Sequence, residues 1–201
     1  PFVMHLPEKE KACAPCHNMT PDDAAFASDS EKTNPCISCH KRMLDRKYVH
    51  GPAGAYSCVS CHERNSKPSR YKVRAKDADL CNECHFDKVK QFKSFVQVHG
   101  PVGVGLCSVC HDSHASEQEA QLLAPVNELC LGCHTSISNQ MHVVRTVSGR
   151  SHPLQEVPDP NRPGHKLSCA SCHDPHGGAG RYFFAGGITS RMALCQRCHN
   201  F

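Results

Sequence analysis

The chain has 201 residues, a formal net charge of +4, sixteen cysteines, sixteen histidines and no tryptophan. Leu, Ile, Val and Phe make up about 18% of it, below the roughly 20% at which a chain is suspected of disorder, so its own side chains predict a poor core. No run of about 18 apolar residues is present, and we expect neither a membrane-spanning helix nor a signal peptide.

In chain order, the pattern C-x-x-C-H occurs eight times and uses every cysteine. Consecutive first cysteines are 22 to 26 residues apart, except for one interval of 39 residues. This is an internal repeat of supersecondary size. The motifs are Cys13–His17, Cys36–His40, Cys58–His62, Cys81–His85, Cys107–His111, Cys130–His134, Cys169–His173 and Cys195–His199.

C-x-x-C-H is the attachment signature of a c-type haem, in which two thiols add to the porphyrin vinyl groups and the next histidine ligates the iron. The sequence therefore predicts eight haem c groups. The predicted thioether residues are Cys13, Cys16, Cys36, Cys39, Cys58, Cys61, Cys81, Cys84, Cys107, Cys110, Cys130, Cys133, Cys169, Cys172, Cys195 and Cys198. The predicted proximal ligands are His17, His40, His62, His85, His111, His134, His173 and His199.

Two other uses of paired cysteines are weighed against haem. C-x-x-C units also form zinc ribbons, and the first two pairs have a suitable gap. Neither a zinc ribbon nor a disulfide framework requires histidine directly after the second cysteine, yet histidine follows in eight of eight motifs. The pattern therefore favours haem over zinc or disulfides.

Eight histidines lie outside the motifs, which equals the number of second axial positions on eight irons. We therefore predict bis-histidine ligation throughout, with a Met ligand as the alternative; a Met would raise the potential of its haem. The predicted distal ligands are His5, His50, His99, His114, His142, His152, His165 and His176. The candidates for a Met ligand are Met4, Met19, Met43, Met141 and Met192.

The spare histidines recur in two patterns. His50 and His99 each begin His-Gly-Pro, eight residues before a first cysteine, and Gly-Pro predicts an extended or turning lead-in rather than a helix. His114 and His176 each follow a proximal histidine by three residues. The porphyrin separates such a histidine from the far face of its own haem, so we expect it to ligate a neighbouring iron.

The predicted fold is mostly coil with short α-helices and little or no β-sheet. Residues 1–201 form one domain, with an N-terminal arm at 1–12 and a long irregular loop at 135–168, which is rich in proline and polar residues. At about 25 residues per haem, the chain cannot wrap each group separately. We therefore expect stacked haems to form most of the core.

A few short helices are predicted. The best is residues 87–98, whose Phe92 and Phe95 are expected to pack on a porphyrin. Ser116 and Glu119 indicate a capping box for a helix ending near residue 124. Side chains that can cap short helices leading into motifs are those of Asp79, Asn127 and Ser190.

Basic residues cluster at Lys41–Lys47, Arg64–Lys76 and Lys88–Lys93. We expect them to pair with haem propionates and solvent, with a docking patch as the alternative. Eight haems with ionised propionates and ferric iron add about −8 to the net charge, so the oxidised holoprotein has a net charge of about −4. Nucleic acid is therefore not an expected partner.

With eight C-x-x-C-H motifs, of which Cys107–His114 and Cys169–His176 are extended to C-x-x-C-H-x-x-H, the whole chain resembles multihaem c-type cytochromes. The resemblance implies haem attachment after export and closely stacked haems that form an electron path. Three settings are similar in sequence: extracellular cytochrome filaments, outer-membrane porin conduits and periplasmic shuttles. The expected function is electron transfer to redox partner proteins or extracellular acceptors.

Among these settings we favour the filament, because motifs lie close to both ends of the sequence and the chain could join copies of itself end to end. An arm at Pro1–Pro7 carries His5, and we expect it to dock on a haem of either its own chain or the adjacent subunit. A periplasmic or conduit cytochrome is the alternative. Octahaem enzymes are also similar, but they are longer and keep an open or Lys-ligated iron. This sequence has no C-x-x-C-K, so we do not expect an enzyme.

Overall fold

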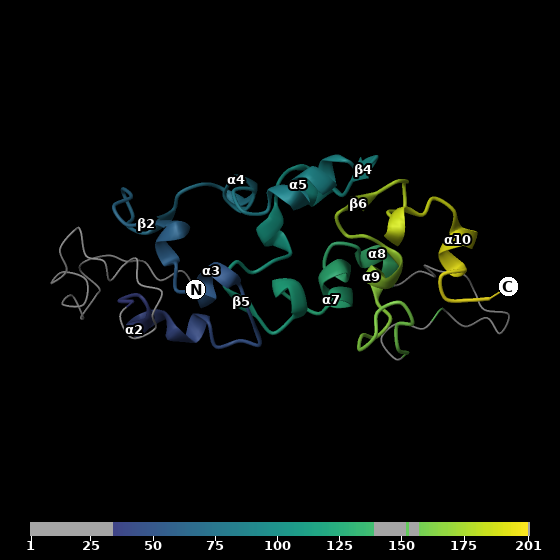
Figure 1. Cartoon of the computed structure of the whole chain (residues 1–201), viewed down its shortest axis with the longest axis horizontal. Helices are drawn as coiled ribbons and strands as arrows, with labels where there is room; N and C mark the ends of the chain where they lie inside the picture. Colours follow the sequence, from purple (N-terminus) through teal and green to yellow (C-terminus); the bar gives the residue numbers. More distant parts are fainter. Residues whose placement is uncertain (1–33, 139–151, 153–156, 201) are drawn as a thin grey trace. The chain divides into compact units, whose positions relative to one another are not determined.

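The structure is a computed structural model that describes residues 34–138, 152 and 157–200 (Figure 1). Contacts divide the chain into two compact units. The first unit comprises residues up to Cys81 together with His111–Gln121, and the second comprises Asn82–Cys110 together with residues from Leu122 onward. Each unit is described by itself.

Regular elements in the first unit are one or two turns long, and coil connects them. Its described helices are α2 (Ile37–His40), η2 (Lys41–Met43), α3 (Gly51–Gly54), η3 (Cys58–Ser60), α4 (Asp77–Cys81) and η5 (Glu119–Gln121). Its strands are β1 (Tyr48–Val49), β2 (His62–Glu63), β3 (Lys72–Val73) and β5 (Ala115–Ser116).

The second unit has the same character. Its helices are α5 (Phe86–Lys93), α6 (Gly100–Gly103), η4 (Cys107–Val109), α7 (Val126–Leu131), α8 (Thr135–Ser138), α9 (Cys169–Cys172), η6 (Ala185–Gly187) and α10 (Arg191–Cys195). Its strands are β4 (Gln97–Val98) and β6 (Gly177–Gly178). None of the described helices is long or apolar enough to cross a bilayer.

In the part of the chain that the structure describes, the strands form three antiparallel pairs, each of two residues per strand. β1 pairs with β5, β2 with β3, and β4 with β6. In register, Val49 lies opposite Ala115, and Val98 lies opposite Gly177. The first and third pairs are equivalent, since each joins the strand before a His-Gly-Pro sequence to the strand after a C-x-x-C-H-x-x-H sequence. The predicted architecture of coil, short helices and little sheet is confirmed.

The described side chains supply almost no apolar core of their own. The buried hydrophobic residues among them are Ile37, Ala115, Leu167 and Phe184. Several large apolar side chains are open to solvent, and Val96 is 76% exposed. So little buried apolar surface cannot offset the entropy of ordering a chain of this length. The fold therefore needs apolar surface that the described polypeptide does not provide.

Two helix predictions need correction. The helix expected over 87–98 begins one residue earlier and ends at Lys93. The Ser94 hydroxyl donates to the Gln91 carbonyl at 2.6 Å, a local bond that competes with helix propagation. The capping box is wrong: Ser116 belongs to β5, and Ala120 has a φ of 55°, which interrupts a helix after Glu119.

The His-Gly-Pro prediction is also wrong in part. His50 and His99 are extended, but the next four residues form the single helical turns α3 and α6. Proline is tolerated there because the first turn of a helix needs no N–H donor. Of the predicted caps, Ser190 is confirmed, since its hydroxyl accepts from the Ala193 amide at 3.1 Å.

The other two predicted caps lie inside helices. Asp79 is within α4, and Asn127 is within α7, where Pro125 takes the N-cap position. In the loop predicted at 135–168, the first four residues form α8, and Pro158 forms a bridge with Lys166. The N-terminal arm with His5 lies outside the described residues.

Candidate functional site

Four of the described motifs are tight turns in which the histidine amide bonds back to the first cysteine. In the motif of Cys169, the His173 amide donates to the Cys169 carbonyl at 2.9 Å, and the motifs of His40, His134 and His199 make the same bond. A helical turn of this kind brings residues four apart to one face. The motifs of Cys58 and Cys107 begin with 3₁₀ turns instead.

Three proximal histidines each make the same kind of hydrogen bond. In His62, His111 and His173, Nδ1–H donates to the carbonyl of the residue nine positions later, at 2.8, 2.8 and 2.6 Å respectively. Two of the acceptors, Tyr71 and Ala120, have φ values of 60° and 55°. Such strained backbone persists where the surroundings hold it in place, often at functional sites.

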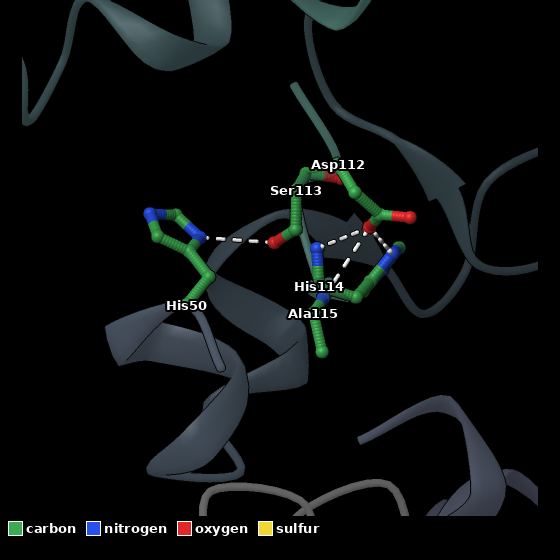
Figure 2. A network of polar contacts seen from close by, with 5 residues as sticks. All are labelled: His50, Asp112, Ser113, His114 and Ala115. Atoms are coloured by element: carbon green, nitrogen blue, oxygen red, sulfur yellow. Dashed lines mark hydrogen bonds and ion pairs between the residues drawn. The ribbon is translucent and has the colours of Figure 1, made fainter. Parts of the chain in front are cut away.

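His50 and His99 are held in matching ways. Nδ1–H of His50 donates to the Ser113 carbonyl at 2.9 Å (Figure 2). The His50 amide donates to the His114 carbonyl, also at 2.9 Å. His99 makes the equivalent bonds to the carbonyls of Pro175 and His176, at 2.8 and 3.0 Å. His50 is thus hydrogen-bonded to His114, and His99 to His176. In each of these pairs, one spare histidine precedes a motif and the other follows a different motif.

The aspartates of the two His-Asp-x-His sequences lie beside the spare histidines. A carboxylate oxygen of Asp112 accepts the amide of His114 at 2.8 Å and lies 3.7 Å from its Nδ1 (Figure 2). The corresponding oxygen of Asp174 accepts the His176 amide at 2.9 Å and lies 3.2 Å from Nδ1 of His176. Burial lowers the pKa of His114, and the charge of Asp112 opposes that shift.

These contacts decide which nitrogen can bind a metal. A carbonyl oxygen only accepts, so a histidine bonded to one through Nδ1 carries its proton there and keeps the Nε2 lone pair. This holds for His50, His62, His99, His111 and His173. A second-shell bond of this type orients metal-binding imidazoles and raises their basicity.

Ring pairs bring proximal and spare histidines together. The ring centroids are 6.0 Å apart for His62 and His114, 6.0 Å for His99 and His134, and 6.2 Å for His152 and His199. Imidazole nitrogens bind metals at about 2.0 to 2.1 Å, so two rings on opposite sides of one metal have centroids about 6 Å apart. The pairs therefore fit a shared iron.

A direct ring stack in the same structure gives the contrast. Phe92 packs on His176 with centroids 4.6 Å apart and an interplanar angle of 13°. His62 and His114 have nearly the same angle, 12°, yet their centroids are 6.0 Å apart. The separation of the histidine rings matches that of two imidazoles on one metal, although Phe92 and Phe95 show that directly neighbouring rings also reach 6.2 Å.

First cysteines of consecutive motifs lie side by side in two places. A hydrogen bond from the Cys36 thiol lowers the pKa of Cys58 to about 6. A bond from the Cys130 thiol lowers the pKa of Cys169 to about 7 and raises that of Cys130 itself. Vinyl groups attached at these thiols would belong to neighbouring haems.

A buried asparagine joins the motifs at each first-cysteine pair. Asn34 is 3% exposed, and its side-chain amide donates to the Tyr56 carbonyl at 2.7 Å. Asn127 is 6% exposed, and its oxygen accepts the Cys169 amide at 2.8 Å. Both asparagines shortly precede one motif and contact the next motif.

Second cysteines also approach each other in the second unit. Burial raises the pKa of Cys110, and the nearby Cys133 adds to the shift. Burial likewise raises the pKa of Cys172, with a further contribution from Cys198. The last four motifs are therefore neighbours in chain order. The second cysteines connect the first two of these motifs, the first cysteines connect the middle two, and the second cysteines connect the last two.

Several predicted ligands are not placed. Cys13, Cys16, His5, His17 and His142 lie outside the described residues, as do three of the five methionines considered as ligands. Met43 and Met192 are 41% and 61% exposed. The His165 carbonyl accepts the Asp159 amide at 2.9 Å.

Sequence reasoning missed the groups that hold the histidines. The carbonyl acceptors carry no sequence signal, because any residue supplies one. Asp112 and Asp174 were visible in the His-Asp-x-His pattern, but no role was assigned to them. Asn127 was interpreted as a cap, whereas it bridges two motifs. The available signal was an asparagine two or three residues before a motif, as at Asn34 and Asn127.

Comparison with known proteins identifies the same repeated motif. A family model described as "Doubled CXXCH motif" matches residues 50–90, 99–139 and 161–201, which is more than half of the chain. The chain is also 34% identical over 65 residues to "High-molecular-weight cytochrome c" of Nitratidesulfovibrio vulgaris; the match covers 32% of this chain and 11% of that protein. The chain therefore belongs to the doubled CXXCH motif family and is a multihaem c-type cytochrome.

Proposed function

We propose that the protein transfers electrons along a chain of eight covalently attached haem c groups, each ligated by two histidines. Bound haem supplies a one-electron redox centre. The observation that carries the proposal is the set of three histidine pairs with ring centroids 6.0, 6.0 and 6.2 Å apart. Each pair joins a motif histidine to a spare histidine.

Because two histidines occupy both axial positions of each proposed haem iron, no iron has an open position for a substrate. The proposed role is therefore electron transfer and not catalysis. The hydrogen bonds to Nδ1 of His62 and His99, at 2.8 Å each, hold the rings in one orientation and raise ligand basicity. Two basic imidazole ligands keep the potential low relative to Met/His ligation.

The order of the electron path follows from the cysteines. The thiols of Cys130 and Cys169 are hydrogen-bonded, and the second cysteines of the motifs on either side are near enough to influence each other's pKa. Thioether attachment at these thiols holds consecutive porphyrin edges near one another. Electrons would therefore pass between motifs in their sequence order in the second unit.

A redox titration tests the function. We expect eight one-electron equivalents per chain, low-spin haem spectra in both oxidation states, and no binding of carbon monoxide to the reduced protein. Binding of carbon monoxide at an appreciable fraction of the irons would show an open position. That result would contradict complete bis-histidine ligation and favour an enzyme.

The cellular setting is a separate proposal, drawn from the resemblance to multihaem cytochromes. We propose that the protein is exported and assembles end to end into an extracellular filament, which passes electrons to external acceptors or redox partner proteins. A periplasmic or porin-conduit cytochrome is the alternative. Electron microscopy of the material released by cells distinguishes the two, since polymers support a filament and monomers at high concentration contradict it.

A further inference from the structure

We propose that the three histidine pairs are the axial ligands of three separate irons, and that the angle between the paired rings divides these sites into two electronic kinds. The inference rests on the proposed function, because it takes haem to be bound. It adds which spare histidine serves which motif, and it predicts a spectroscopic difference between the sites.

The pairing follows from the ring contacts. The two members of a pair are 52, 35 and 47 residues apart, so each iron ties together distant parts of the sequence. The assigned pairs are His62 with His114, His134 with His99, and His199 with His152.

A shared metal explains why the separations agree. Direct packing does not hold ring separations to one value, since Phe92 lies 4.6 Å from His176 but 6.2 Å from Phe95, at interplanar angles of 13° and 26°. The histidine pairs have interplanar angles of 12°, 22° and 85°, yet their centroid separations differ by only 0.2 Å. Ligation fixes the separation whatever the angle, because each ring rotates about its own bond to the metal.

The angle then sets the electronic character of each site. An imidazole donates π density to the iron d orbital that lies perpendicular to its ring. Two nearly parallel rings act on the same orbital and split the pair of π-type orbitals widely, which gives a rhombic low-spin EPR signal. Two perpendicular rings act on both orbitals alike, which gives a strongly anisotropic signal with a large maximum g value.

The pairs therefore separate into two classes. The His62–His114 and His99–His134 pairs, at 12° and 22°, give rhombic signals. The pair of His152 and His199, at 85°, gives a large-maximum-g signal.

The test is low-temperature EPR of the fully oxidised, full-length holoprotein and of two matched variants, His152→Met and His114→Met. Haem content is measured for each variant by absorbance after alkaline pyridine treatment. Subtracting the variant spectrum from that of the wild type isolates the signal of the altered haem. We expect the His152→Met difference to contain one large-maximum-g component and the His114→Met difference to contain one rhombic component.

A rhombic component in the His152→Met difference, or an unchanged spectrum, would overturn the assignment. If His152→Met loses haem, His152→Ala is measured with and without added imidazole. We expect one high-spin haem that imidazole converts to low spin, and the same large-maximum-g component in the difference. Failure of the proposed function shows separately, as high-spin haem in the wild-type protein before any substitution.

Discussion

The carboxylate of Asp112 should lower the potential of one haem, and Asp112→Asn tests this. Its oxygen lies 3.7 Å from Nδ1 of His114. An imidazole ring adds about 4 Å between Nδ1 and a metal on Nε2. The charge therefore sits about 7 to 8 Å from the iron, where a unit charge contributes about 2 kcal/mol at an effective dielectric constant near 20.

Exposure to solvent weakens this interaction between the Asp112 charge and the iron. The Asp112 side chain is 38% exposed, so a contribution of about 1 to 2 kcal/mol is the working estimate. Because about 1.4 kcal/mol corresponds to 59 mV for one electron, Asp112→Asn should raise the potential of one haem by about 40 to 90 mV. The sign is upward because a nearby negative charge stabilises the ferric state.

The assay is an optical redox titration resolved into its components. Asparagine keeps an oxygen that accepts the amides of His114 and Ala115, so the turn is retained. Glu117→Gln is the matched control, since Glu117 is 58% exposed and pairs with Arg46 at 3.6 Å. If no component shifts, or if the control shifts as much, the carboxylate does not act on an iron.

Four further predictions follow from the same contacts. Asp174→Asn should shift a component at least as far, because its oxygen is 3.2 Å from a histidine Nδ1; a smaller shift in the same titration would contradict this. His99→Met should raise the potential of one haem and leave the others nearly unchanged; an unaltered titration would refute its role as ligand. Asn127→Ala should destabilise the holoprotein by about 1 to 3 kcal/mol in thermal unfolding, because it leaves a buried amide unpaired; an unchanged midpoint would contradict the bridge. Gly177→Ala should cost about 1 to 3 kcal/mol, because its Cβ would lie 2.5 Å from the Gln97 carbonyl oxygen. Gly100→Ala, which meets no atom within 4 Å, is its control, and equal losses in both variants would refute the steric cause.

The haem-attachment pattern and the fold class could be predicted from the sequence because both depend on local signals. C-x-x-C-H is contiguous, and the scarcity of apolar side chains already indicated a chain of coil and short turns. The Ser190 cap was predictable for the same reason, since the hydroxyl acts on an amide three residues away.

What failed depended on contacts between distant segments. Ser116 reads as a helix cap in isolation, but β1 draws it into a strand opposite Tyr48. Asn127 reads as a cap too, yet its partner is the amide of Cys169, 42 residues away. The histidine pairing could not be predicted, because the sequence shows how many ligands there are but not which imidazole rings lie close together in the fold.

The most direct test of the central claim is a coulometric titration of the matured protein followed by its haem absorption. We predict uptake of eight electrons per chain, one for each C-x-x-C-H motif, with low-spin spectra from the fully oxidised to the fully reduced state. Fewer than eight electrons, or high-spin haem at any stage, would contradict a chain of eight bis-histidine haems.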